Sequence, residues 1–142
     1  MTRRKALGID PGERRIGVAV SDDSGLIASP HSVIDRSRED PAARIAALCD
    51  ELDVATVVVG LPVTLAGAEG ASAAAARGLG AEIAVASGRN LVYWDERFTS
   101  VQAEQSLLEA GVSRRRRREL TDKVAAAMML QGYLDHEPTE DE

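Results

Sequence analysis

The sequence has few residues of several types, and each shortage excludes a class of protein. A single cysteine, Cys49, cannot form an internal disulfide, which fits a reducing, cytoplasmic environment. The two histidines have no zinc-type spacing with that cysteine, so a zinc site is not expected. No apolar run approaches the roughly 18 residues of a membrane span, so we expect no membrane contact. Aromatic residues make up only 3%, which predicts a core of aliphatic side chains and alanine.

Positive charge is also scarce overall. The chain carries a formal net charge of −6 and has a pI of about 5.0. An acidic protein does not bind nucleic acid through its bulk charge, so such a role needs a local basic patch. The run Arg114–Arg118 is a candidate for that patch. A solvated charge run is the commoner explanation of such a stretch, and a phosphate-binding loop is the alternative.

The 142 residues fit one domain with a substantial core. We place that domain at residues 1–136 and expect the acidic tail at 137–142 to be disordered. Short apolar, β-branched runs predict strands, and apolar residues spaced three and four apart predict helices. The predicted strands are 6–9, 16–20, 25–34, 56–59 and 91–94, and the predicted helices are 40–52, 71–87, 99–111 and 119–135. This order predicts an α/β fold with a mixed five-stranded sheet and helices on both faces.

The stretch 6–22 organises the rest of the chain. Two apolar runs flank Pro11-Gly12, a pair that favours a tight turn, and together they predict a β-hairpin. The first run ends on Asp10, which therefore lies at the end of a buried strand. A carboxylate in that place is destabilising unless it has a partner. Asp10 can be a turn residue that accepts hydrogen bonds from nearby backbone N–H groups, or it can belong to a site.

Two further acidic positions stand out. The pair Asp95-Glu96 follows the fifth predicted strand, and ligands of open α/β sheets gather at the carboxyl ends of parallel strands. Asp122 belongs to the last predicted helix, on a face that is otherwise apolar apart from the Tyr133 hydroxyl. We therefore expect Asp122 to point toward the sheet. The alternative is that Asp122 lies in the first turn of that helix and only complements the helix dipole.

Three carboxylates that converge favour a different chemistry from three separate structural acids. Asp and Glu oxygens are the ligands that Mg²⁺ and Mn²⁺ prefer. Three of them can hold one or two ions for an in-line displacement at phosphorus. In that reaction one ion generates the attacking hydroxide and the other stabilises the leaving oxygen.

Four motifs follow one another along the chain. They are G-I-D-P-G-E-R-R-I-G-V-A-V-S-D at 8–22, G-L-P at 60–62 with Gly67, D-E-R-F-T-S-V-Q-A-E at 95–104, and T-D-K-V-A-A-A-M-M-L-Q-G-Y-L-D at 121–135. In this order they resemble the YqgF/RuvX family of Holliday-junction resolvases or pre-16S rRNA nucleases, which have an RNase H-like fold. One departure is the loop at 63–66, which is largely apolar where the family often has Asn or Asp.

The resemblance implies a nuclease with an RNase H-like fold and one or two Mg²⁺ or Mn²⁺ ions as its cofactor. The catalytic and metal-binding acids that it implies are Asp10, Glu96 and Asp122. Arg97 and the region of Arg15 would lie near the scissile phosphate. The arginine run fits this picture as a mobile basic loop just before Asp122. The substrate-binding residues are then Arg15, Arg97, Arg114, Arg115, Arg116, Arg117 and Arg118.

The function we expect is a metal-dependent endonuclease for structured nucleic acid, acting on the 5′ end of pre-16S rRNA in ribosome biogenesis. A Holliday junction resolvase is the alternative, and the sequence does not decide between RNA and DNA. A resolvase that cuts symmetrically would need a homodimer. An ATP-binding protein of the actin and sugar-kinase type shares the hairpin, but it needs a second domain and a second phosphate hairpin. A noncatalytic nucleic-acid-binding module would not need all three carboxylates.

Overall fold

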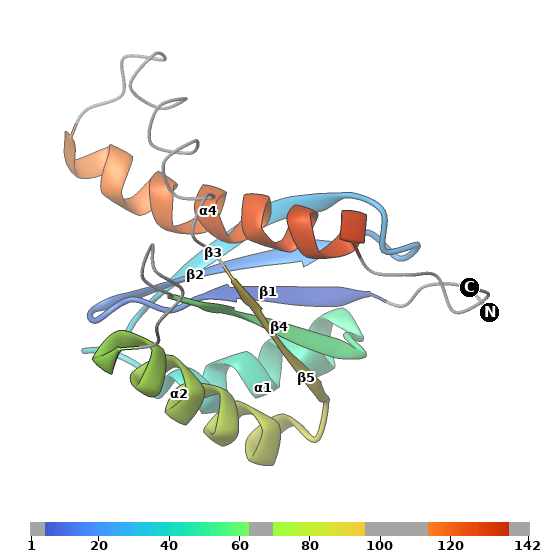
Figure 1. Cartoon of the computed structure of the whole chain (residues 1–142), viewed down its shortest axis with the longest axis horizontal. Coiled ribbons are helices and arrows are strands. Elements are labelled where there is room, and N and C mark those ends of the chain that lie inside the picture. The colour runs from blue at the N-terminus through green and yellow to red at the C-terminus, as the bar shows by residue number, and fades with distance from the viewer. Residues whose placement is uncertain (1–4, 63–69, 96–113, 137–142) are drawn as a thin grey trace.

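The computed structural model describes residues 5–62, 70–95 and 114–136, except for the side chains of residues 114–121. Its strands are β1 (Ala6–Asp10), β2 (Arg15–Ser21), β3 (Ala28–Asp35), β4 (Thr56–Leu61) and β5 (Asn90–Asp95) (Figure 1). Its helices are α1 (Pro41–Leu52), α2 (Ala71–Ser87) and α4 (Arg114–His136). The helix predicted at 99–111, the loop at 63–66 and the tail at 137–142 lie outside the described residues. None of these three helices has the length and apolar composition needed to cross a membrane.

The strands form one mixed sheet in the order β3-β2-β1-β4-β5. β1 pairs antiparallel with β2, and β2 pairs antiparallel with β3, so the first three strands form a meander that begins with the predicted hairpin. β1, β4 and β5 are mutually parallel. The carboxyl ends of these three strands, at Asp10, Leu61 and Asp95, therefore meet at one edge of the sheet. The predicted mixed five-stranded sheet is confirmed.

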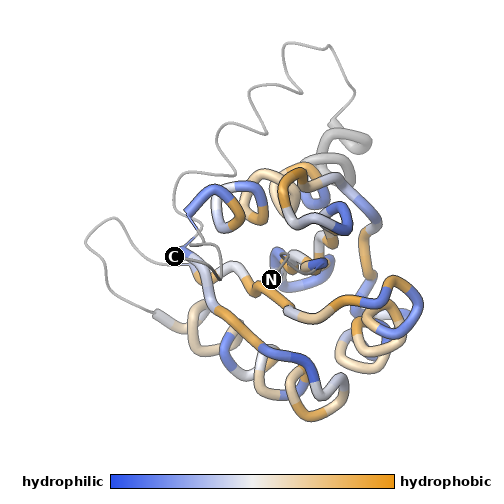
Figure 2. The backbone as a smooth tube through the Cα atoms, turned by 90° about the vertical axis from the view of Figure 1, so that its right-hand side faces the viewer, coloured by the Kyte–Doolittle hydropathy of each residue, from blue (hydrophilic) through white to orange (hydrophobic). Residues whose placement is uncertain are grey.

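Helices cover both faces of the sheet, as predicted (Figure 1). One core cluster joins Leu7 and Ile9 of β1 to buried residues of α1 and α2. A second cluster joins Ala6 and Val58 to Met129 and other buried residues of α4. Figure 2 shows the hydrophobic stretches of the strands lying between the two helical layers. The core is mostly aliphatic, which agrees with the low aromatic content.

The last helix differs from the prediction at its beginning. We predicted a mobile basic loop at Arg114–Arg118 and a helix from about residue 119, whereas α4 begins at Arg114. Arginine is a good helix former, and the run continues into the helix without glycine or proline. The basic stretch therefore lengthens the helix. The arginine positions form the first turns of the element that carries Asp122.

Candidate active site

Asp10 is the last residue of β1 and lies on the face of the sheet that α4 covers. Successive side chains of a strand point to opposite faces. Leu7 and Ile9 pack toward α1 and α2, whereas Ala6 packs with α4. Asp10 lies four residues after Ala6, so it faces the same side of the sheet, and it is half-buried at the end of the strand. The strand thus delivers a carboxylate to the edge where the parallel strands end.

Gly17 lets α4 approach the sheet at the level of Asp10. In the β1–β2 ladder Gly17 is the register partner of Asp10. A Cβ atom built on Gly17 would collide with the backbone carbonyl oxygen of Asp122. Only a residue without a side chain permits this contact between strand and helix backbones. Asp10 and Asp122 are therefore brought to the same place from opposite ends of the sequence.

The Asp122 side chain points toward the sheet, as predicted, and is held by an arginine of β2. Arg15 donates a hydrogen bond from Nε to Oδ2 of Asp122 over 2.9 Å, which is also an ion pair. The side chains of Arg15 and Asp122 are 36% and 29% exposed. Ion pairs open to water contribute about 0–1 kcal/mol to stability. The main effect of this pair is therefore to fix the orientation of the Asp122 carboxylate.

The helix-dipole explanation for Asp122 is wrong. That explanation required Asp122 to lie in the first turn of its helix, and α4 begins at Arg114, so Asp122 is its ninth residue. Interaction with the helix dipole falls off within the first turn. The position instead follows the apolar face that Ala126 and Met129 bury against the sheet. Asp122 lies at the end of this buried stripe, where water still reaches it.

The remaining predicted site residues are not tested by the structure. Glu96 and Arg97 lie outside the described residues, and the arginines 114–118 are described by their backbone alone. Within the described ranges, no group of three His, Cys, Asp or Glu residues could hold a metal ion. The predicted metal-binding set contains Glu96, so this search does not cover it. The structure brings together Asp10, Arg15 and Asp122, and the third acid stays a prediction.

Asp22 shows what a structural carboxylate looks like in this chain. Its Oδ1 accepts backbone hydrogen bonds from Leu26 at 2.8 Å and Ile27 at 3.1 Å, and its Oδ2 accepts one from the Ser24 hydroxyl at 2.9 Å. These bonds, from Ile27 and Leu26 before Ser24, hold the pKa of Asp22 below its usual range. Accepting hydrogen bonds from a turn is the alternative role that we considered for Asp10. Asp22 has this role in the connection between β2 and β3.

Sequence reasoning missed two features of the site. The first is the bond between Arg15 and Asp122, which are 107 positions apart, so that no local spacing could indicate it. The second is the role of Gly17. Here a signal was available, because a glycine inside a strand often marks the close approach of another backbone. Combined with the predicted inward face of the last helix, that signal could have located the crossing point.

Comparisons with known proteins show the family to which the chain belongs. A family model described as "RuvX: Holliday junction resolvase" matches residues 4–136. The chain belongs to the RuvX family. A relative from Myxococcus xanthus, named "Putative pre-16S rRNA nuclease", is 44% identical over 136 residues and aligns over 94% of this chain and 90% of its own. A relative from Anaeromyxobacter sp. with the same name is 47% identical over 130 residues, covering 91% and 95% of the two chains.

Solved structures support the RNase H-like fold. The RuvX chain is similar to Thermus thermophilus RuvC in complex with a Holliday junction substrate, with a TM-score of 0.58 and 20% identity. The match covers 96% of this chain and 98% of that chain. A second RuvC structure from the same organism gives a TM-score of 0.52 at 18% identity. At this level of identity the likeness shows the fold, and the predicted RNase H-like class is confirmed.

Proposed function

We propose that this RuvX protein is a metal-dependent endonuclease that hydrolyses phosphodiester bonds in structured nucleic acid in the cytoplasm. We propose pre-16S rRNA as the substrate and processing of its 5′ end as the role. The observation that carries the proposal is the meeting of Asp10 and Asp122 across Gly17 at the carboxyl edge of the parallel strands. Membership of the RuvX family supports the nuclease activity, and the names of the relatives support an RNA substrate.

The residues fit a hard divalent cation. Asp10 and Asp122 offer carboxylate oxygens, the donors that Mg²⁺ and Mn²⁺ prefer, and both are half-buried at one edge of the sheet. Glu96 directly follows β5 in the sequence, and β5 is one of the three parallel strands whose carboxyl ends meet at this edge. This position in the sequence supports Glu96 as the third ligand. One or two such ions would supply an activated water and stabilise the charge on the leaving oxygen.

Arg15 has two tasks in this proposal. Its bond to Asp122 orients one of the proposed ligands before a metal ion binds. A guanidinium has five N–H donors, and the bond to Asp122 uses the one on Nε, so Arg15 can also donate to a phosphate oxygen of the substrate. This agrees with the prediction that the region of Arg15 lies near the scissile phosphate. Arg97, next to Glu96 in the chain, is proposed to act beside it.

The arginine run is the basic stretch that we propose for phosphate contacts in a chain of net charge −6. Residues 114–118 are helical, and successive positions of a helix are about 100° apart around its axis, so the five positions do not share one helix face. Positions 115 and 118 precede Asp122 by seven and four residues, which places them on the same helix face as Asp122. We assign the phosphate contacts of the run chiefly to these two positions.

A cleavage panel tests the function. The substrates are an RNA that spans the 5′ end of the 16S precursor, a four-way DNA junction and a linear duplex, each with Mg²⁺, Mn²⁺ or EDTA. We expect metal-dependent cutting of the precursor RNA by the wild type and none by Asp10→Asn. If none of the three substrates is cut with Mn²⁺, the chain is a noncatalytic binding module and the proposal fails.

A Holliday junction resolvase is the second candidate, because the family model carries that description. Preferential cutting of the four-way junction in the same panel would select it. Symmetric cutting of a junction requires two active sites, so this function also predicts a homodimer. Light scattering of the protein with and without the junction measures that state.

A further inference from the structure

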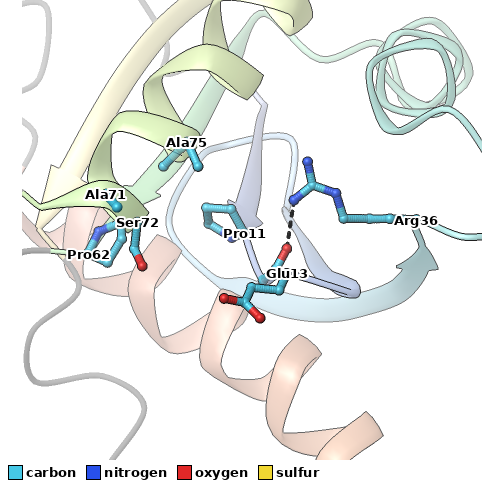
Figure 3. Close-up of a pocket in the computed structure, with 9 residues that line it drawn as sticks. Pro11, Glu13, Arg36, Pro62, Ala71, Ser72 and Ala75 are labelled. Atoms are coloured by element: carbon cyan, nitrogen blue, oxygen red, sulfur yellow. Dashed lines mark hydrogen bonds between the residues drawn. The ribbon is translucent and has the colours of Figure 1, made fainter.

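A cavity of about 300 Å³ lies beside the proposed active site, at the same edge of the sheet (Figure 3). Its walls come from the β1–β2 turn at 11–13, from Arg36 after β3, from Pro62 after β4 and from the first turns of α2. Pro11 directly follows Asp10 in the chain. The turn therefore separates the cavity, on the α2 side, from the acids, on the α4 side.

Arg36 gives this cavity a fixed positive group. Its backbone N–H donates to the carbonyl of Arg14 at 2.9 Å, and its Nη1 donates to the carbonyl of Gly12 at 2.7 Å. Both partners are neutral carbonyls, and the Nη1 bond orients the guanidinium without neutralising its charge. Glu13 is exposed, and Figure 3 shows its carboxylate pointing away from the Arg36 guanidinium. An anion that binds to the Arg36 guanidinium would therefore not lie next to the Glu13 carboxylate.

Proline and alanine side chains form much of the rest of the wall. Pro11 and Pro62 present their rings, and Ala71 and Ala75 present methyl groups from α2 (Figure 3). Small apolar surfaces of this kind fit the face of a flat ring, and Ser72 adds a hydroxyl that can bond to a polar edge. The volume lies at the lower end of the range for small-molecule sites, which suits one nucleotide and excludes a duplex.

We propose that this cavity binds a single unpaired nucleotide of the nucleic-acid substrate. The base lies against Pro11, Pro62 and Ala75, and a phosphate next to it lies on Arg36. The inference rests on the proposed nuclease function, because it supposes that a strand crosses the neighbouring acids. The inference adds a substrate preference to that function, namely for nucleic acid that is unpaired beside the cleaved bond.

The experiment measures binding without cleavage. A short fluorescein-labelled single-stranded RNA and an otherwise identical RNA with abasic sites are titrated with the full chain in EDTA, and anisotropy gives the Kd. Ala75→Leu fills the cavity from an exposed helix position. Ala74→Leu is the matched control, because it adds the same side chain to the neighbouring exposed position, which does not line the cavity.

We expect Ala75→Leu to weaken binding of the intact RNA roughly tenfold, within the range for losing one base contact. The same change leaves binding of the abasic RNA unaltered, and Ala74→Leu affects neither RNA. Arg36→Gln weakens binding of both RNAs and lowers the slope of log K against log salt by about 0.7, the value for one phosphate contact. Thermal melting shows whether Arg36→Gln still folds.

Three results would overturn the inference. Equal Kd values for Ala75→Leu and Ala74→Leu with the intact RNA would show that no base enters the cavity. Competition by a free nucleoside monophosphate with unchanged RNA binding in Ala75→Leu would show that the cavity serves a free nucleotide instead. Failure of the wild type to bind the intact RNA would show that no single strand is held beside the acids. All three results leave the proposed function to be decided by the cleavage panel.

Discussion

Arg15 of the hairpin donates a hydrogen bond from Nε to Oδ2 of Asp122 in the last helix over 2.9 Å. The bond places a cation against a carboxylate that we propose as a metal ligand. We infer that in the metal-free protein the guanidinium offsets repulsion between Asp122 and Asp10, which the Gly17 contact brings to the same edge of the sheet. A metal ion at the two acids would take over that neutralisation, and Arg15 would then be available to the substrate.

The first prediction concerns this exchange. Arg15→Gln removes the cation, so the metal-free protein should melt lower by at most about 4 °C, since a pair open to water contributes at most roughly 1 kcal/mol. The rise in melting temperature on adding Mn²⁺ should become larger, because the metal ion no longer competes with a guanidinium for Asp122. Cleavage should fall. Thermal melting with and without Mn²⁺ and a cleavage assay measure the three effects.

Arg14→Gln is the control for Arg15→Gln. Arg14 is the preceding residue and its side chain is exposed, so the substitution removes the same charge from the turn without touching Asp122. If Arg14→Gln and Arg15→Gln give the same metal response, the effect comes from net charge and the proposed exchange is wrong.

Asp122→Asn tests the acid itself. The substitution keeps the shape of the side chain but removes the charge that a hard cation needs. We expect the shift of melting temperature with Mn²⁺ to shrink and cleavage to disappear, while stability without metal changes by about 1 kcal/mol or less because the lost ion pair is partly exposed. A variant that keeps the full Mn²⁺ shift and still cuts would show that Asp122 is not a ligand.

Asp10→Asn and Glu96→Gln should each abolish cleavage and leave the fold intact. Both changes are isosteric, so circular dichroism and melting curves should match the wild type while the cleavage rate falls below detection. Asp22→Asn is the matched control, since Asp22 is engaged in turn hydrogen bonds away from the site. It should lose some stability and keep full cleavage. Wild-type activity in both Asp10→Asn and Glu96→Gln would end the assignment of the nuclease to these acids.

Much of this architecture could be predicted from hydrophobic patterning. The continuous apolar run of Val57, Val58 and Val59 predicts a strand covered on both faces, and all three residues are fully buried. The turn chemistry of Pro11-Gly12 predicts the hairpin. Asp10 could be predicted at a strand end, because the run before it is apolar and the turn after it is unambiguous.

The parts that could not be predicted depend on tertiary contacts or on competing local signals. The bond between Arg15 and Asp122 needs the helix to cross β2 at one particular residue, and no spacing in the sequence specifies that residue. The beginning of α4 was misplaced because a run of like charges indicates a solvated loop, whereas arginine also has a high helix propensity. The arginine run is helical in the structure, and it is joined directly to a helix that packs on the sheet.

Gly17→Ala tests the crossing point. The added Cβ meets the Asp122 carbonyl, a backbone atom that cannot rotate away, so the helix must move off β2. We expect a loss of about 1–3 kcal/mol in the free energy of unfolding, the usual cost of overpacking, together with a loss of cleavage. Urea denaturation and the cleavage assay measure the two effects.

Gly78→Ala is the matched substitution in α2. A Cβ at Gly78 meets no atom within 4 Å, so the change should only raise helix propensity and stabilise the protein by up to about 1 kcal/mol. Equal effects of the two glycine substitutions would show that the contact at Gly17 does not set the position of α4.

The last prediction separates two faces of the arginine run. Because the run is helical, the double change Arg115→Gln and Arg118→Gln alters the face that carries Asp122, while Arg116→Gln and Arg117→Gln alters the opposite side with the same loss of charge. The first pair should lower the slope of log K against log salt by about 1.4 to 1.8, from two contacts at roughly 0.7 to 0.9 each. The second pair should change the slope far less.

Anisotropy titrations of a precursor RNA at several salt concentrations in EDTA measure both slopes. Equal slopes for the two double variants would mean that the run acts only through its total charge, and the assignment of positions 115 and 118 to phosphate contacts would be wrong.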